Sequence, residues 1–327
     1  TEDGRGMYIS TRFGDVSQIH RVDMPGGARN QITFYNEPIG GVSRQPGGRN
    51  IIFTRDAGGS EFSQVFLLDP IDGTTTMLTD GESRNGGVEW DRDGRRIAYT
   101  STARNGRSND VWIMDPQDDS SAQVALESPD GSSWSATEFN ASGTRVLISN
   151  YVSIADSRVN LLDLDTGAVT LLAGGDDNRS ANFPFAFDDD NGGFWFVTDQ
   201  GSEFRQLAWQ AAEPGAEPEI LTADIPWDVG AGAISNDRKR LVFTANEGGM
   251  SRVYLLDTET REYRTVDNIP TGLAFGFEFS PDDSQLAMTL NTSTTPSDTF
   301  VLELGDDPLE YGSLVRWTTS EVGGVNT

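Results

Sequence analysis

Short apolar runs recur at regular intervals along the whole chain, each preceded by a turn signal. They begin 44 to 49 residues apart, at Met7, Ile51, Ile97, Val146, Trp195, Leu241 and Leu286. A second marker is a seven-residue segment such as SRVYLLD (Ser251–Asp257), whose copies end at residues 23, 69, 115, 163, 208, 257 and 303. Two independent markers with one period of about 47 residues indicate an array of seven repeats.

The third repeat, residues 86–128, shows which elements one unit contains. Its runs GGVEW, RRIAYTST, DVWIMD and AQVALES are rich in strand-forming residues, and they are separated by an Asp-Arg-Asp-Gly turn, a polar loop at 103–108 and a turn at 116–121. Four antiparallel strands in each repeat are typical of a propeller blade, whereas β-sandwiches do not repeat at four-strand intervals. We therefore predict an all-β fold, a seven-bladed β-propeller of four-stranded antiparallel blades.

We expect a single domain over residues 1–327, because a closed ring of blades is one cooperative unit. The blades are expected at about 1–35 plus 323–327, 36–82, 83–128, 129–175, 176–224, 225–268 and 269–322. GGVNT at 323–327, placed before TEDGRGMYIST at 1–11, has the layout of GGVEW-DRDGRRIAYTS at 86–101. One hypothesis is that 323–327 supply the inner strand of the first blade. The other is that this strand lay upstream of residue 1.

The strongly negative net charge of the chain disfavours negatively charged partners. A net charge of −27 argues against a nucleic-acid backbone as partner, since the phosphates would repel the protein. The chain has no cysteine, so it forms no disulfide, and it has no run of apolar residues long enough to span a membrane.

His20 is the only histidine, so a Ser-His-Asp triad within this chain would have to be built on it. Across the repeats it aligns with a recurrent packing position, occupied by Phe66, Trp112, Asn160, Arg205, Tyr254 and Phe300. The chain also has no G-x-S-x-G sequence around a nucleophilic serine. We interpret His20 as a structural residue and predict no catalytic residue and no cofactor in this chain.

Three glutamates are the candidate substrate-binding residues. Glu89, Glu138 and Glu278 each precede the aromatic residue that ends an inner strand. The equivalent slots of other repeats hold small side chains, Ser43, Ala186 and Ala233. Carboxylates around a central tunnel could bind a cation or a substrate amine. The alternative is a hydrated polar ring that binds nothing.

Other motifs have structural interpretations. The acidic segment 188–192 lacks the alternating carboxylates and distal glutamate of a calcium loop, so it is predicted to be a turn, and no metal site is predicted. Glycines at 40–41 and within 230–232 (Gly-Ala-Gly) favour close approach of blades over phosphate binding. Trp134 and Trp227 could contact a partner or pack between blades.

Several segments carry a resemblance to a known family. The sequences FSPDDSQLAMT…SDTFVLELGD, VEWDRDGRRIAYTS…NDVWIMDPQ and LDLDTGAVTLL resemble the propeller of the prolyl oligopeptidase family of serine peptidases. STRFGDVSQIHRVDMPGGARNQITF at 10–34 and SLVRWTTSEVGG at 313–324 are similar to bacterial members. The blade motif is shared with TolB-type propellers.

The resemblance implies a role for the chain. It would be the non-catalytic, substrate-gating propeller of an oligopeptidase whose C-terminal α/β-hydrolase domain carries Ser, Asp and His and cleaves peptides. The helical glutamate pair by which dipeptidyl peptidases hold a substrate amino terminus has no match. The alternative is a free-standing TolB-like propeller that docks a protein partner. Related bacterial enzymes are exported, which favours a periplasmic or secreted location over the cytoplasm.

Overall fold

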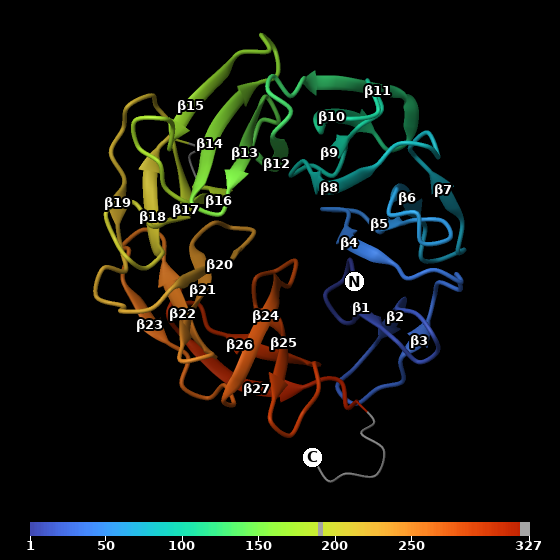
Figure 1. The fold of residues 1–327 in the computed structure, drawn as a ribbon. Coiled ribbons are helices and arrows are strands. Elements are labelled where there is room, and N and C mark those ends of the chain that lie inside the picture. The colour runs from blue at the N-terminus through green and yellow to red at the C-terminus, as the bar shows by residue number, and fades with distance from the viewer. Residues whose placement is uncertain (189–191, 321–327) are drawn as a thin grey trace. The chain divides into compact units, whose positions relative to one another are not determined.

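The computed structural model describes residues 1–188 and 192–320, and every regular element in them is a β-strand. The strands form seven antiparallel sheets, each built from consecutive segments of the chain (Figure 1). Six sheets contain four strands, and the first contains three in the part described. These sheets are the blades of a seven-bladed β-propeller, which confirms the predicted all-β fold class.

The chain divides into two compact units, and the first holds most of blades one to four. Blade one contains β1 (Met7–Thr11), β2 (Gln18–Val22) and β3 (Asn30–Gln31). Blade two contains β4 (Gly40–Arg44), β5 (Ile51–Arg55), β6 (Gln64–Leu68) and β7 (Thr75–Met77). Blade three contains β8 (Asn85–Trp90), β9 (Ile97–Ser101), β10 (Asp110–Asp115) and β11 (Asp118–Leu126). Blade four contains β12 (Ser133–Phe139), β13 (Arg145–Ser153), β14 (Asp156–Asp163) and β15 (Val169–Ala173).

The second unit holds blades five to seven, together with residues 3–6 and 22–28. Blade five contains β16 (Asn182–Phe187), β17 (Gly193–Thr198), β18 (Gln206–Ala211) and β19 (Glu219–Ile220). Blade six contains β20 (Val229–Ile234), β21 (Arg240–Glu247), β22 (Met250–Asp257) and β23 (Tyr263–Thr265). Blade seven contains β24 (Gly272–Phe279), β25 (Gln285–Thr292), β26 (Asp298–Leu304) and β27 (Tyr311–Arg316). The hypothesised inner strand of blade one, 323–327, lies outside the described residues.

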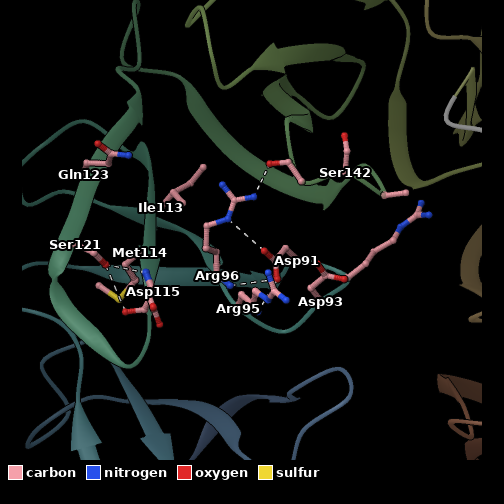
Figure 2. Close-up of a pocket in the computed structure, with 13 residues that line it drawn as sticks. Asp91, Asp93, Arg95, Arg96, Ile113, Met114, Asp115, Ser121, Gln123 and Ser142 are labelled. Atoms are coloured by element: carbon pink, nitrogen blue, oxygen red, sulfur yellow. Dashed lines mark hydrogen bonds and ion pairs between the residues drawn. The ribbon is translucent and has the colours of Figure 1, made fainter.

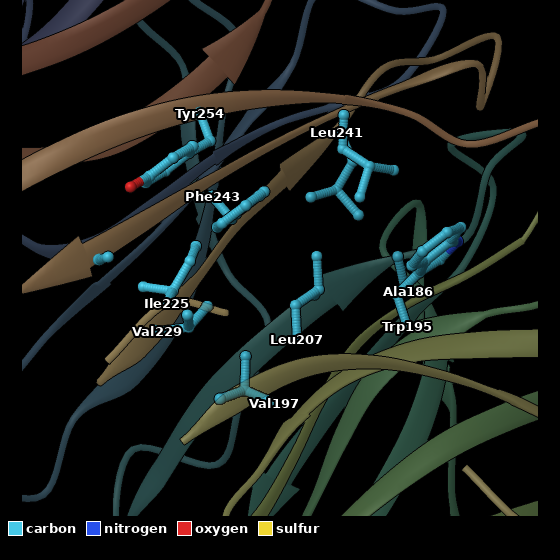
Figure 3. Close-up of a cluster of buried hydrophobic side chains, with 11 residues drawn as sticks. Ala186, Trp195, Val197, Leu207, Ile225, Val229, Leu241, Phe243 and Tyr254 are labelled. Carbon is cyan, nitrogen blue, oxygen red and sulfur yellow. The ribbon is translucent and has the colours of Figure 1, made fainter. Parts of the chain in front are cut away.

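The core consists of clusters that join consecutive blades. The cluster between blades five and six contains Trp195 and Leu207 from one blade and Leu241 and Phe243 from the next, each at most 1% exposed (Figure 3). The second strand of blade five, β17, is buried along its whole length, which explains why its sequence is a continuous apolar run rather than an alternating one. Burying one such large side chain contributes about 1.5–3 kcal/mol, so blade contacts stabilise the array far more than any single turn does.

A recurring hydroxyl fixes the outer edge of several blades. In four blades a threonine that follows the outermost strand accepts a hydrogen bond from a main-chain N–H of the strand before it, at 2.8–3.1 Å. These pairs are Thr33 with Ile19, Thr79 with Val65, Thr222 with Leu207, and Thr318 with Thr299. The hydroxyl replaces a backbone partner where the ladder ends, so a buried N–H remains satisfied.

Blade five corrects two positions of the predicted alignment. The residue of β18 that faces Phe196 is Ala208, so Ala208 and not Arg205 is equivalent to Phe66, which faces Phe53. The apolar run of β17 likewise begins in register at Phe194 rather than Trp195. The Ser and Asp that mark the motif lie at or next to the ends of a strand, and blade five lacks them at the equivalent positions. The alignment of blade five with the other blades follows from which residues pair across its strands, and the sequence motif does not indicate that pairing.

The third repeat also differs from prediction at one turn. The expected turn at 116–121 is shorter, because β11 begins at Asp118, which pairs with Asp115. Ser121 accepts a hydrogen bond from the Asp115 N–H at 2.8 Å and donates to the Asp118 carbonyl at 2.6 Å. These bonds hold an irregular hairpin in which the polar run Asp118–Ser121 is strand, although its composition is typical of a loop.

The turns between first and second strands link neighbouring blades. Gln45 of blade two donates from its side chain to the Gly94 carbonyl of blade three at 2.7 Å. Gly94 has φ +66°, and a Cβ there would lie 2.3 Å from the Pro46 carbonyl oxygen, so glycine is required on both counts.

The described residues contain no helix long and apolar enough to cross a membrane.

Candidate functional site

The three candidate glutamates occupy structurally equivalent slots. In six blades the first-strand slot faces the second residue of the apolar run on the second strand. The pairs are Ser43–Ile52, Glu89–Ala98, Glu138–Leu147, Ala186–Trp195, Ala233–Val242 and Glu278–Ala287. Each first strand has a register shift at or just before this slot. Such bulges re-aim side chains, and they recur here at the same place in the blade.

The glutamates differ in their surroundings. Glu138 keeps 16% of its side chain exposed and forms an ion pair with Arg92 of blade three, with 3.8 Å between the charged atoms. Glu89 is half-buried and Glu278 is exposed. The first unit contains Glu89 and Glu138, and the second contains Glu278. A substrate-binding role for the three remains a prediction, and Arg92 already offsets part of the charge of Glu138.

His20 is a buried packing residue in β2, with 1% of its surface exposed. Its Nδ1 lies 3.0 Å from the Gln18 carbonyl oxygen, so Nδ1 is the protonated nitrogen of the neutral ring. The Phe13 ring meets it edge-on at 5.1 Å, and Nε2 has no hydrogen-bond partner among the described residues. Burial lowers the pKa of His20 most, the hydrogen bond to Gln18 opposes this, and the nearby charge of Arg29 lowers the pKa further.

The remaining sequence candidates are structural where they are described. Most of the acidic segment 188–192 lies outside the described residues, but Asp188 accepts hydrogen bonds from the Gly193 N–H at 3.1 Å and the Trp209 indole at 3.0 Å. Trp134 is 8% exposed and donates to Asp130, so the suggestion that it contacts a partner is wrong. Trp227 is 40% exposed and stays available to a partner.

A cavity of about 460 Å³ lies between blades three and four, within the first unit (Figure 2). Its walls are the turn after β8, the facing parts of β10 and β11, and the turn after β12. The lining includes three arginines and three aspartates, namely Arg92, Arg95, Arg96, Asp91, Asp93 and Asp115. Ile113, which is 5% exposed, contributes apolar surface, whereas the Met114 side chain packs in the cluster between blades two and three.

Asp91 and Arg96 hold the cavity walls together. Asp91 is 4% exposed and accepts hydrogen bonds from the Arg95 and Arg96 N–H groups at 2.7 and 3.1 Å and from Arg96 Nε at 3.2 Å. Arg96 also donates to the Gly143 carbonyl of blade four and lies over the Phe139 ring at 5.6 Å. In Figure 2 the Arg96 guanidinium therefore lies between the Asp91 turn and the turn that contains Ser142. These two side chains are committed to structure and are not available to a ligand.

Sequence reasoning did not identify this cavity. Its signal is present in the turn DRDGRR, which concentrates three arginines in a strongly acidic chain. From the sequence alone, this segment predicts only the Gly-containing turn of a blade. The contribution of β11 and of the blade-four turn could not be read from one repeat, because those residues belong to other strands.

Comparison with known proteins places the chain among the peptidase propellers. Residues 33–311 match the family described as "Prolyl oligopeptidase, N-terminal beta-propeller domain". A chain from a structural and mechanistic analysis of two prolyl endopeptidases superposes with a TM-score of 0.78 at 12% identity. The match covers 98% of this chain and 49% of that one, so this chain spans about half of its length. The chain belongs to the family of prolyl oligopeptidase N-terminal β-propeller domains.

Proposed function

We propose that this chain is the non-catalytic, substrate-gating propeller of a serine peptidase whose α/β-hydrolase domain supplies the catalytic residues. The observation that carries the proposal is the family match over residues 33–311. The fold likeness to half of a prolyl endopeptidase chain supports a two-domain parent.

The state of His20 supports catalysis by another domain. It is the only histidine of the chain, and its Nε2 is buried, where a substrate does not reach it. A Ser-His-Asp mechanism needs an imidazole that takes a proton from serine and returns it to the leaving group. The imidazole of the parent enzyme therefore comes from outside these residues.

Size selection is the property that tests the gating role. The parent enzyme should cleave short chromogenic peptides and fail to cleave long unfolded chains, while its hydrolase domain expressed without the propeller should lose this preference. A ladder of peptides of increasing length, digested by both proteins and followed by mass spectrometry, measures the preference. Equal cleavage of all lengths by the parent enzyme would contradict the gating role.

A free-standing binding propeller is the second candidate, and exposed apolar side chains of the first unit support it. Phe13, Phe34, Phe62 and Ile154 are 44–83% exposed. They lie in the loops β1–β2, β3–β4, β5–β6 and β13–β14, and the alternating directions of consecutive antiparallel strands place these loops at the same edge of the blades. This edge fits either a hydrolase domain or a separate protein. The intact mass of the natural protein distinguishes the two, because a hydrolase domain adds substantially to 35.5 kDa.

Export is also part of the proposal. A periplasmic or secreted location is what the resemblance to bacterial members of the family implies. Cell fractionation that recovers the natural protein only with cytoplasmic markers would refute it.

A further inference from the structure

We propose that the cavity between blades three and four binds a short peptide through its free amino and carboxyl ends. The proposal rests on the lining of the cavity and does not depend on a hydrolase domain. A volume of about 460 Å³ is typical of small-molecule sites.

The charges that remain uncommitted determine which ligand fits. Among the described residues, no hydrogen bond or ion pair involves the side chains of Arg95, Asp93 or Gln123, and all three are exposed. Asp115 uses one carboxylate oxygen to accept from the Gln117 N–H at 2.8 Å, which leaves the other oxygen available. The cavity thus offers one free guanidinium, free carboxylates and a free amide.

This mixture excludes ligands of a single charge. A phosphate or other polyanion would have to lie beside Asp91, Asp93 and Asp115, and a divalent cation would lie beside the arginines. A zwitterion satisfies both signs, with its carboxylate on Arg95 and its ammonium on Asp93 or Asp115. Charge-assisted hydrogen bonds are stronger than neutral ones, and the site can form one with the ligand carboxylate and another with the ligand ammonium.

The apolar part of the lining favours a peptide over a bare polar zwitterion. Ile113 of β10 lines the cavity behind the charged rim and offers an apolar contact on which an aliphatic side chain can pack. Gln123, exposed on β11, can hydrogen-bond a peptide group. The structure therefore assigns a dipeptide-sized ligand with an aliphatic residue and both termini free.

Isothermal titration of the propeller chain with glycyl-leucine tests the proposal at low ionic strength. The dipeptide should bind, and N-acetylation or C-amidation should each weaken binding by about tenfold, the loss expected for one charged contact of about 1.4 kcal/mol. Arg95→Gln should weaken glycyl-leucine by a similar factor and should no longer distinguish it from glycyl-leucinamide. Asp93→Asn and Asp115→Asn, singly or together, should remove the discrimination against the acetylated peptide.

The control is Arg107→Gln, which removes an exposed arginine of the same blade that does not line the cavity. It should bind as the wild type does, and matching thermal unfolding curves should show that every variant is folded. Absence of binding at tens of millimolar dipeptide would overturn the proposal. Equal binding of the capped and free peptides, or an Arg95→Gln protein that still prefers a free carboxylate, would overturn it as well.

Discussion

Replacing His20 with phenylalanine isolates the titration of one buried group. His20 is the only histidine, so no other side chain with an ordinary pKa near neutrality competes with it. Phenylalanine is the residue that the repeat itself places at the equivalent position, as in Phe66 and Phe300. The variant should therefore fold with the ring in the same packing.

The pH dependence follows from the direction of the shift. The pKa of His20 in the native state is lowered, chiefly by burial, while the unfolded chain has a histidine pKa of about 6.5. As the pH falls below about 6.5, the unfolded state binds a proton that the native state does not, so the free energy of unfolding decreases. It can decrease by no more than about 1.4 kcal/mol per pH unit for one proton. The decrease ends once the pH is below the native pKa.

Urea denaturation of both proteins between about pH 5 and 7.5 measures this contribution. The carboxylates titrate in both proteins, so the difference between the two curves reports His20 alone. Wild-type stability should fall relative to His20→Phe as the solution is acidified, with equal m-values. At pH 7 the two should differ by about 1 kcal/mol or less, because the variant loses the Gln18 hydrogen bond and gains apolar burial. A difference that stays constant with pH would refute a lowered native pKa.

Three further outcomes follow from the structure. Asp298 is fully buried and accepts a hydrogen bond from Arg316 at 2.6 Å. Asp298→Asn should therefore lower the free energy of unfolding, measured by urea denaturation, by about 2–4 kcal/mol. A decrease below about 1 kcal/mol would contradict a stabilising role for this ion pair. Thr222→Val keeps the shape but leaves the Leu207 N–H unpaired, and it should cost about 1–3 kcal/mol, whereas Thr222→Ser should cost less. In the proposed parent peptidase, Glu138→Gln should raise KM for substrates with a free amine and leave kcat unchanged. An unchanged KM would refute a substrate contact.

The periodic part of the fold was predictable because it depends on positions that every blade repeats. Apolar runs, turn glycines and the glutamate slots recur at one period, and the strand register confirms that Glu89, Glu138 and Glu278 are equivalent. Prediction failed in blade five, where the Ser and Asp at the ends of the motif are missing. Blade five lost its marker, and Arg205 was aligned in place of Ala208, three residues away.

The threonines that cap the outer edge of several blades recur in the sequence, but the sequence does not reveal their role. Thr79 and Thr222 follow leucine at the same distance after the third strand, in MLTDG and ILTAD. The hydroxyl matters because the hydrogen-bond ladder ends there and one N–H would otherwise be buried without a partner. That requirement becomes evident only once the strand pairing is known.

Arginines at equivalent positions of different blades have different hydrogen-bond and ion-pair partners. Arg96, Arg145 and Arg240 each stand immediately before the apolar run of a second strand. Arg145 pairs with Asp163 of its own blade at 3.8 Å, whereas Arg240 donates to carbonyl groups of the 305–308 loop in the next blade.

Arg96 differs from both, because it donates a hydrogen bond to the Gly143 carbonyl in the short turn of the next blade. Each partner is set by the length and conformation of a neighbouring loop, which varies between blades although the strand pattern does not. The cavity forms where Arg96 spans from one turn to the next and leaves Arg95 and Asp93 facing open space beside it. A binding site in a repeat protein can therefore arise from loop differences alone, with every strand position unchanged.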